Sequence, residues 1–178
     1  GKTLAQIFLG SPSGDTAVHM KDGARSLVFT VDKTLADDLQ RAAAAYRAKD
    51  VFAFKPFTVS RLVVTRGDST RTFEKTKSGS DTNATDTWAQ TMPADAGVTA
   101  ATIDDIVSRF GTLRAEAWAD VPRSSTPLID VVATYGDGKD ERVTIVQAGD
   151  ERFALRAGEP GAARLTAAAV TDILDLLE

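Results

Sequence analysis

The chain has 178 residues, a formal net charge of −4, one His and no Cys. This length is enough for one domain or two small lobes with a hydrophobic core. The lack of Cys excludes disulfides, thiolate nucleophiles, iron–sulfur clusters and Cys-ligated zinc. The mild acidity argues against a nucleic-acid partner, because proteins that bind polyanions concentrate Lys and Arg on one face.

Residues 1–48 contain three short apolar runs separated by turn residues, and are predicted to form three strands. The first strand is expected to end at Gly10, before a turn at residues 11–14. Asp32 follows the third run, and apolar residues at helical spacing continue to Tyr46. Because Asp is a preferred N-cap residue, we expect a helix over this stretch.

Residues 49–120 repeat this order. A strand at 59–64 leads through the turn signal Gly67-Asp68 to a hairpin partner, and the polar run 75–86 predicts a hairpin tip. Thr102, with Asp105 three positions later, is expected to cap a helix. The apolar face of that helix is predicted to consist of Ile103, Ile106, Val107 and Phe110.

Residues 121–178 begin with a strand at 128–135, which runs to the turn Gly136-Asp137-Gly138 and a hairpin partner. Thr166 is expected to cap a terminal helix. The pattern predicts an α+β fold of antiparallel β-meanders, each followed by a covering helix. The predicted fold consists of three βββα-like units, 1–48, 49–120 and 121–178, which form one or two compact lobes.

The first and third segments match each other loosely. Strands and turns over residues 7–31 follow the same order as those over 145–165, and a helix comes next in both. Chance similarity of hairpins and an internal duplication both explain this match. Under duplication, the strand 128–135 has no counterpart before Gly1, and the sequence is expected to begin inside a longer repeat.

Polar residues that suggest catalysis have simpler explanations. His19 lies in an alternating strand pattern with no nucleophile signalled nearby, and is expected to face solvent. Gly10–Gly14 resembles a nucleophile elbow, but its central residue is Pro12 where Ser is required. Asp137, Asp140 and Glu141 do not have the spacing of a calcium loop, so a solvated hairpin tip is expected.

Trp88 and Trp118 are the candidate interaction or stacking residues, because each offers a large amphipathic ring. The alternative for Trp88 is packing in the core. The alternative for Trp118 is filling the junction between lobes. We predict no catalytic residue, no cofactor and no metal site.

Several segments resemble one bacterial family. Residues 28–32, 46–54 and 59–64 follow its order of strand, helix, charged connecting segment and strand, and a lone Trp88 precedes Pro93. On these residues the chain resembles domain of unknown function 4340. The resemblance covers nearly the whole chain and concerns packing, because none of the matching residues is catalytic in that family.

The resemblance implies an extracytoplasmic protein held by one N-terminal transmembrane helix. Some members occur beside or fused to components of ABC transport and gliding-motility systems. The chain begins at Gly1 without Met and contains no run of the roughly 20 apolar residues that span a bilayer, so an anchor is expected to have been removed.

These observations favour a non-enzymatic, membrane-anchored extracytoplasmic domain that binds a protein or envelope component as an accessory of a transport system. The alternative is a small carbohydrate-binding or hydrolytic protein with a cleft of carboxylates and Trp. A purely structural spacer is the third hypothesis.

Overall fold

The computed structural model describes residues 5–78, 85–94 and 97–178. The chain divides into two compact units, Gly1–Arg47 (unit 1) and Ala48–Glu178 (unit 2), and each is described by itself.

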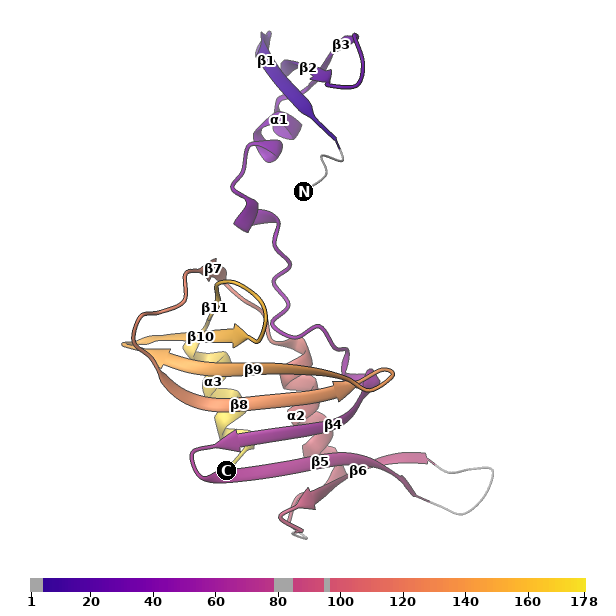
Figure 1. The fold of residues 1–178 in the computed structure, drawn as a ribbon, viewed down its shortest axis with the longest axis vertical. Coiled ribbons are helices and arrows are strands. Elements are labelled where there is room, and N and C mark those ends of the chain that lie inside the picture. The colour runs from indigo at the N-terminus through magenta and orange to yellow at the C-terminus, as the bar shows by residue number, and fades with distance from the viewer. Residues whose placement is uncertain (1–4, 79–84, 95–96) are drawn as a thin grey trace. The chain divides into compact units, whose positions relative to one another are not determined.

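Unit 1 is a three-stranded antiparallel sheet followed by a short helix (Figure 1). Its elements are β1 (Ile7–Ser13), β2 (Ala17–Asp22), β3 (Val28–Asp32), α1 (Lys33–Leu39) and the 3₁₀ turn η1 (Ala43–Tyr46). β2 lies in the centre, since it pairs with both β1 and β3.

Two predicted boundaries in unit 1 are wrong. β1 continues past Gly10, because an irregularity in its pairing with β2 between Leu9 and Pro12 accommodates the segment that was expected to form a turn. α1 ends at Leu39 rather than at Tyr46, and a 3₁₀ turn replaces its predicted second half. The predicted cap is confirmed, since the Asp32 side chain accepts a hydrogen bond from the Thr34 backbone N–H at 2.8 Å.

Unit 2 contains one eight-stranded sheet with order β6-β5-β4-β8-β9-β10-β11-β7, and each pair of neighbouring strands is antiparallel. Its first half consists of η2 (Pro56–Thr58), β4 (Val59–Arg66), β5 (Ser69–Ser78), β6 (Thr85–Met92), α2 (Ala100–Thr112) and β7 (Ala117–Ala119). Its second half consists of β8 (Thr126–Tyr135), β9 (Lys139–Ala148), β10 (Glu151–Arg156), β11 (Ala162–Leu165) and α3 (Ala167–Leu176).

The predicted α+β class with antiparallel strands is confirmed at this level. The expected series of three separate meanders is wrong, because the strands form one three-stranded sheet and one eight-stranded sheet. β4 pairs with β8, so the segments on either side of residue 120 share one sheet, and β7 closes that sheet against β11. β7 and β11 were not expected as strands, because they are only three and four residues long.

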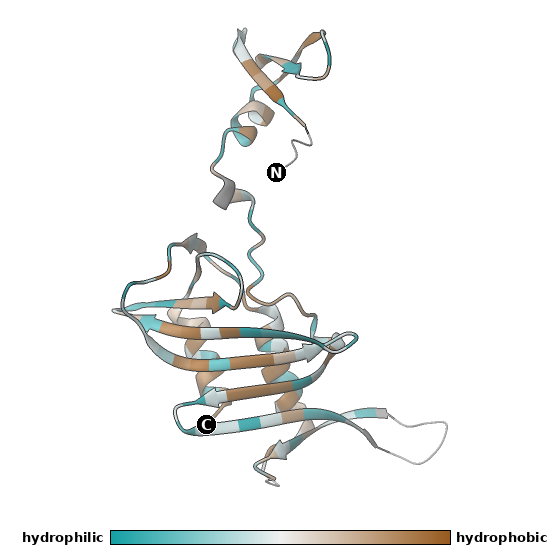
Figure 2. Ribbon diagram, in the orientation of Figure 1, coloured by the Kyte–Doolittle hydropathy of each residue, from teal (hydrophilic) through white to brown (hydrophobic). Residues whose placement is uncertain are grey.

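The core of unit 2 lies between the sheet and the two helices, which cover the same face (Figure 1). The hydropathy colouring shows brown along the strands and the helices that face each other (Figure 2). Phe52 and Phe54 enter this core from the segment before η2, and the Phe52 ring lies 5.6 Å from that of Phe110. The predicted helix face is confirmed, since all its members are buried: Ile103, Ile106, Val107 and Phe110.

The helix cap predicted at Thr102 is wrong by one turn. α2 begins at Ala100, and the Thr99 side chain accepts the hydrogen bond from the Thr102 backbone N–H. Two Ala residues follow Thr99 and favour helix, so the earlier Thr takes the cap position. The cap at Thr166 is confirmed. The predicted hairpin tip is shorter than expected, because β5 runs to Ser78, and residues 79–84 lie outside the described residues.

Candidate functional site

One face of the unit 1 sheet is built almost entirely from apolar side chains. The register places Leu9 opposite Met20 and Met20 opposite Phe29, so these side chains share a face. By the same alternation, that face holds Ile7, Leu9, Val18, Met20, Phe29 and Val31, together with Asp22, which lies opposite Ile7.

Unit 1 leaves many apolar side chains in contact with solvent, on this face and elsewhere. Among its described residues, only Ala36 is buried. The large apolar side chains that are exposed come from β1, from β3 and the residue before it, from α1 and from η1: Ile7, Phe8, Leu27, Val28, Phe29, Leu35, Leu39 and Tyr46. An exposed apolar set of this kind is typical of an interaction surface.

The described part of unit 2 has far fewer large apolar side chains in solvent, namely Phe57, Met92 and Val121. They come from η2, from the end of β6 and from the segment between β7 and β8. The contrast identifies unit 1 as the part of the chain that carries the candidate binding surface.

His19 belongs to β2, on the sheet face opposite to Met20. Its Nδ1 lies 3.1 Å from the backbone oxygen of Ser11, and the residue is half-buried. Ser11 and Ser13 belong to β1 and not to a turn. The contact of His19 is therefore with the backbone of the neighbouring strand.

The structure does not bring the two Trp residues together. Trp88 is in β6 and Trp118 in β7, which are the opposite edges of the eight-stranded sheet. Trp88 is only 5% exposed and belongs to the core, with Lys75 Nζ 5.3 Å from the centre of its ring. Trp118 is half-buried, and its Nε1 donates to the backbone oxygen of Ala48 at 3.1 Å. Of the two rings, Trp118 alone retains substantial exposed area for stacking.

A buried ion pair joins two neighbouring strands of unit 2. Glu141 in β9 is 7% exposed, and its Oε1 lies 2.8 Å from Nε of Arg156 in β10. Both carboxylate oxygens of Glu141 also accept from the Ala53 backbone N–H, at 3.0 and 2.9 Å. Arg156 donates to the backbone oxygen of Val51 and pairs with Glu159, each at 2.7 Å.

This cluster fixes the segment that enters unit 2 against the sheet. Val51, Phe52 and Phe54 must be buried, and the backbone groups among them need partners that the sheet ladder does not supply. Glu141 and Arg156 provide an acceptor and a donor for that backbone. The pair is therefore positioned for structure, because a buried charge is tolerated only when it is paired and hydrogen-bonded.

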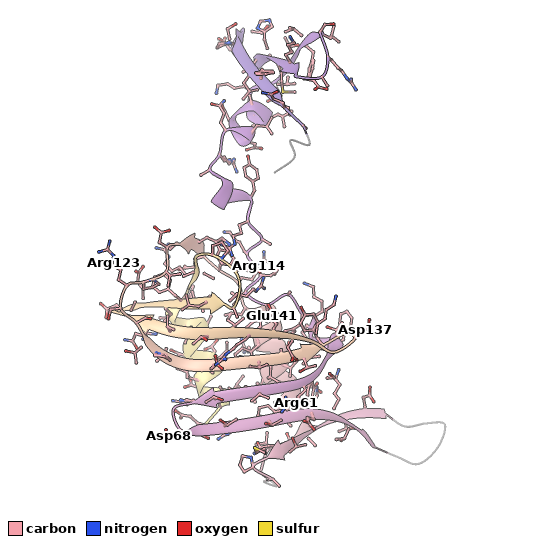
Figure 3. The ribbon with its side chains drawn as sticks, in the orientation of Figure 1. Arg61, Asp68, Arg114, Arg123, Asp137 and Glu141 are labelled. Atoms are coloured by element: carbon pink, nitrogen blue, oxygen red, sulfur yellow. The ribbon has the colours of Figure 1, made fainter. Side chains whose placement is uncertain are left out.

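The hairpin tip is solvated only in part. Figure 3 labels Asp137 at the turn between β8 and β9, and Glu141 farther along β9. Asp137 and Asp140 are exposed, and Asp140 accepts from the Thr134 hydroxyl at 2.6 Å. The prediction is wrong for Glu141. It shares a strand face with Val143 and Ile145, both fully buried, and this alternation was a signal in the sequence that could have identified it.

An open cavity of about 340 Å³ lies beside this ion pair. Its lining includes Tyr135, three carboxylates and two arginines: Asp140, Glu141, Glu159, Arg142 and Arg156. This cavity therefore combines carboxylates with an aromatic ring. Each of these carboxylates already holds a hydrogen bond or an ion pair, so the arrangement stabilises Arg156 and the turn rather than leaving a free general acid or base.

A second open cavity, of about 430 Å³, lies between β5, β6 and the ends of both helices. Arg71, Gln90 and Thr102 contribute polar groups to it. The Gln90 amide nitrogen donates to the backbone oxygen of Pro93 at 2.8 Å. Residues 95–96, which follow closely in the chain, are outside the described ranges.

Asp32 and Arg142, both within the described part of the chain, have a clearly shifted pKa. Hydrogen bonds from the Thr34 hydroxyl and backbone N–H lower the pKa of Asp32. The hydrogen bond and the charge of Asp130 raise the pKa of Arg142. In both cases the interactions that shift the pKa stabilise the charged side chain. Charged Asp32 caps α1, and charged Arg142 forms a cross-strand ion pair with Asp130.

Within residues 5–78, 85–94 and 97–178, no helix has the length and apolar content that crossing a membrane requires. Across the same residues, no group of three or more His, Cys, Asp or Glu side chains is arranged to hold a metal ion.

Comparison with known proteins gives one match. A family model described as "Domain of unknown function (DUF4340)" matches residues 1–130, which include all of unit 1 and half of the unit 2 sheet. No curated protein and no solved structure matches the chain.

Proposed function

Because this chain belongs to the DUF4340 family, whose description assigns no activity, we propose a role from its own surfaces: it is a non-enzymatic binding domain that recruits a protein partner through unit 1. The observation that carries the proposal is the apolar surface of unit 1, a sheet and helix in which Ala36 alone is buried among the described residues. A small unit with so little buried area gains stability when a partner covers that surface.

The partner is a protein or an envelope component, and the setting is extracytoplasmic. Members of the family resemble extracytoplasmic proteins held by a membrane helix, some of them beside ABC transport or gliding-motility components. We therefore place this domain outside the cytoplasm, held by a membrane anchor, as an accessory of a transport or envelope system.

The experiment compares partner capture by matched surface variants. Ile7→Asp and Leu39→Asp each put a charge on the apolar surface of unit 1, where the side chains are 48% and 44% exposed. Phe57→Asp is the matched control, because Phe57 is an exposed apolar residue of unit 2. After chemical cross-linking in membranes of the source organism, the wild type and the control should capture the same envelope protein, and both unit 1 variants should lose it.

Unchanged capture by the two unit 1 variants, with circular dichroism confirming their fold, would contradict the proposal. The same panel addresses localisation, because a partner found only among cytoplasmic proteins would contradict the extracytoplasmic setting.

A second function, carbohydrate binding or hydrolysis, is favoured by the cavity beside Tyr135 with its three carboxylates. A flat aromatic ring next to carboxylates is a common arrangement for sugar recognition. Tyr135→Ala would then abolish binding to one class of oligosaccharide on a glycan array, while Trp118→Ala would test the remaining candidate ring. If the wild-type protein binds no glycan, this second function is rejected and the recruiting role remains.

A further inference from the structure

No further inference is drawn: the strongest candidate, the open cavity of about 430 Å³ between β5, β6 and the ends of α2 and α3, carries nothing, because Oε1 of Gln90, which has no hydrogen-bond donor within the described part of the chain, is itself buried and is not reached from the cavity.

Discussion

Ile7 in β1 and Val143 in β9 occupy the same position relative to the helix that follows their sheets, yet Ile7 is half exposed and Val143 is fully buried. The difference reflects their neighbours. β8 pairs with β9 in unit 2, and among the described strands only β2 pairs with β1. Among the described residues, unit 1 therefore exposes an apolar side chain at a position that unit 2 buries, and this exposure is the physical basis of the proposed binding role.

Unit 1 should unfold before unit 2, because it buries far less apolar area. Both Trp residues are in unit 2, so Trp fluorescence follows that unit alone, while far-ultraviolet circular dichroism follows both. In a urea titration we expect circular dichroism to show an early transition that Trp fluorescence lacks. Coincident transitions by the two probes would show that the units unfold together and would contradict this prediction.

Glu141→Gln should destabilise unit 2 by about 3 kcal/mol, the lower end for a broken buried ion pair, because Arg156 keeps Glu159 and the Val51 carbonyl as partners. The matched control is Glu74→Gln, which breaks the exposed pair with Arg61 at 2.9 Å and should cost at most about 1 kcal/mol. Urea unfolding, monitored by Trp fluorescence, measures the loss in the free energy of unfolding of each variant. Equal losses would show that burial of the Glu141 pair has no energetic consequence.

Gly111 lies in α2 against Pro56, and a Cβ on it would come within 2.8 Å of the Pro56 ring. Gly111→Ala should therefore destabilise unit 2 by about 1–3 kcal/mol through overpacking, although Ala favours helix over Gly. In a Pro56→Ala background the nearest ring atoms are absent, so the loss should shrink. Stabilisation by Gly111→Ala in the otherwise wild-type chain would contradict the close approach.

The stability of unit 1 should depend on pH through Asp32. Hydrogen bonds from Thr34 lower its pKa below the ordinary value of 3.8, so the folded state favours the carboxylate. The contribution is fully present above the unfolded pKa, and is lost as pH falls through the lowered folded pKa. An NMR titration of the Asp32 carboxyl carbon should have a midpoint below 3.8 in the wild type, and Thr34→Ala should raise that midpoint, because it removes the hydroxyl donor and keeps the backbone N–H. A wild-type midpoint at or above 3.8 would contradict it.

Local patterns predicted most of the elements, because turn residues and caps act over a few residues. Asp32 and Thr166 cap their helices as expected, and Gly67 forms its turn with φ of 56°. The short strand that contains Trp118 was not predictable, since its assignment depends on pairing with β11, about 45 residues later in the chain.

The candidate site was predictable only in part. Apolar runs predicted strands at the positions of β1 and β3, but the face that these strands share depends on their pairing with β2, and local sequence does not report that pairing. The partners of Glu141 are likewise remote, at Ala53 and Arg156. Trp88, chosen for its large ring, lies in the core, because ring size favours burial as much as recognition.

Site-specific photocross-linking tests whether unit 1 binds a partner through its apolar face. A photoreactive amino acid replaces Phe29 on the apolar face of unit 1 or, as the control, Phe57 in unit 2, and the protein is irradiated in membranes of the source organism. We expect one envelope protein to be cross-linked from position 29 and to be absent from position 57. Identical products from both positions, or none from position 29, would contradict a binding role for unit 1.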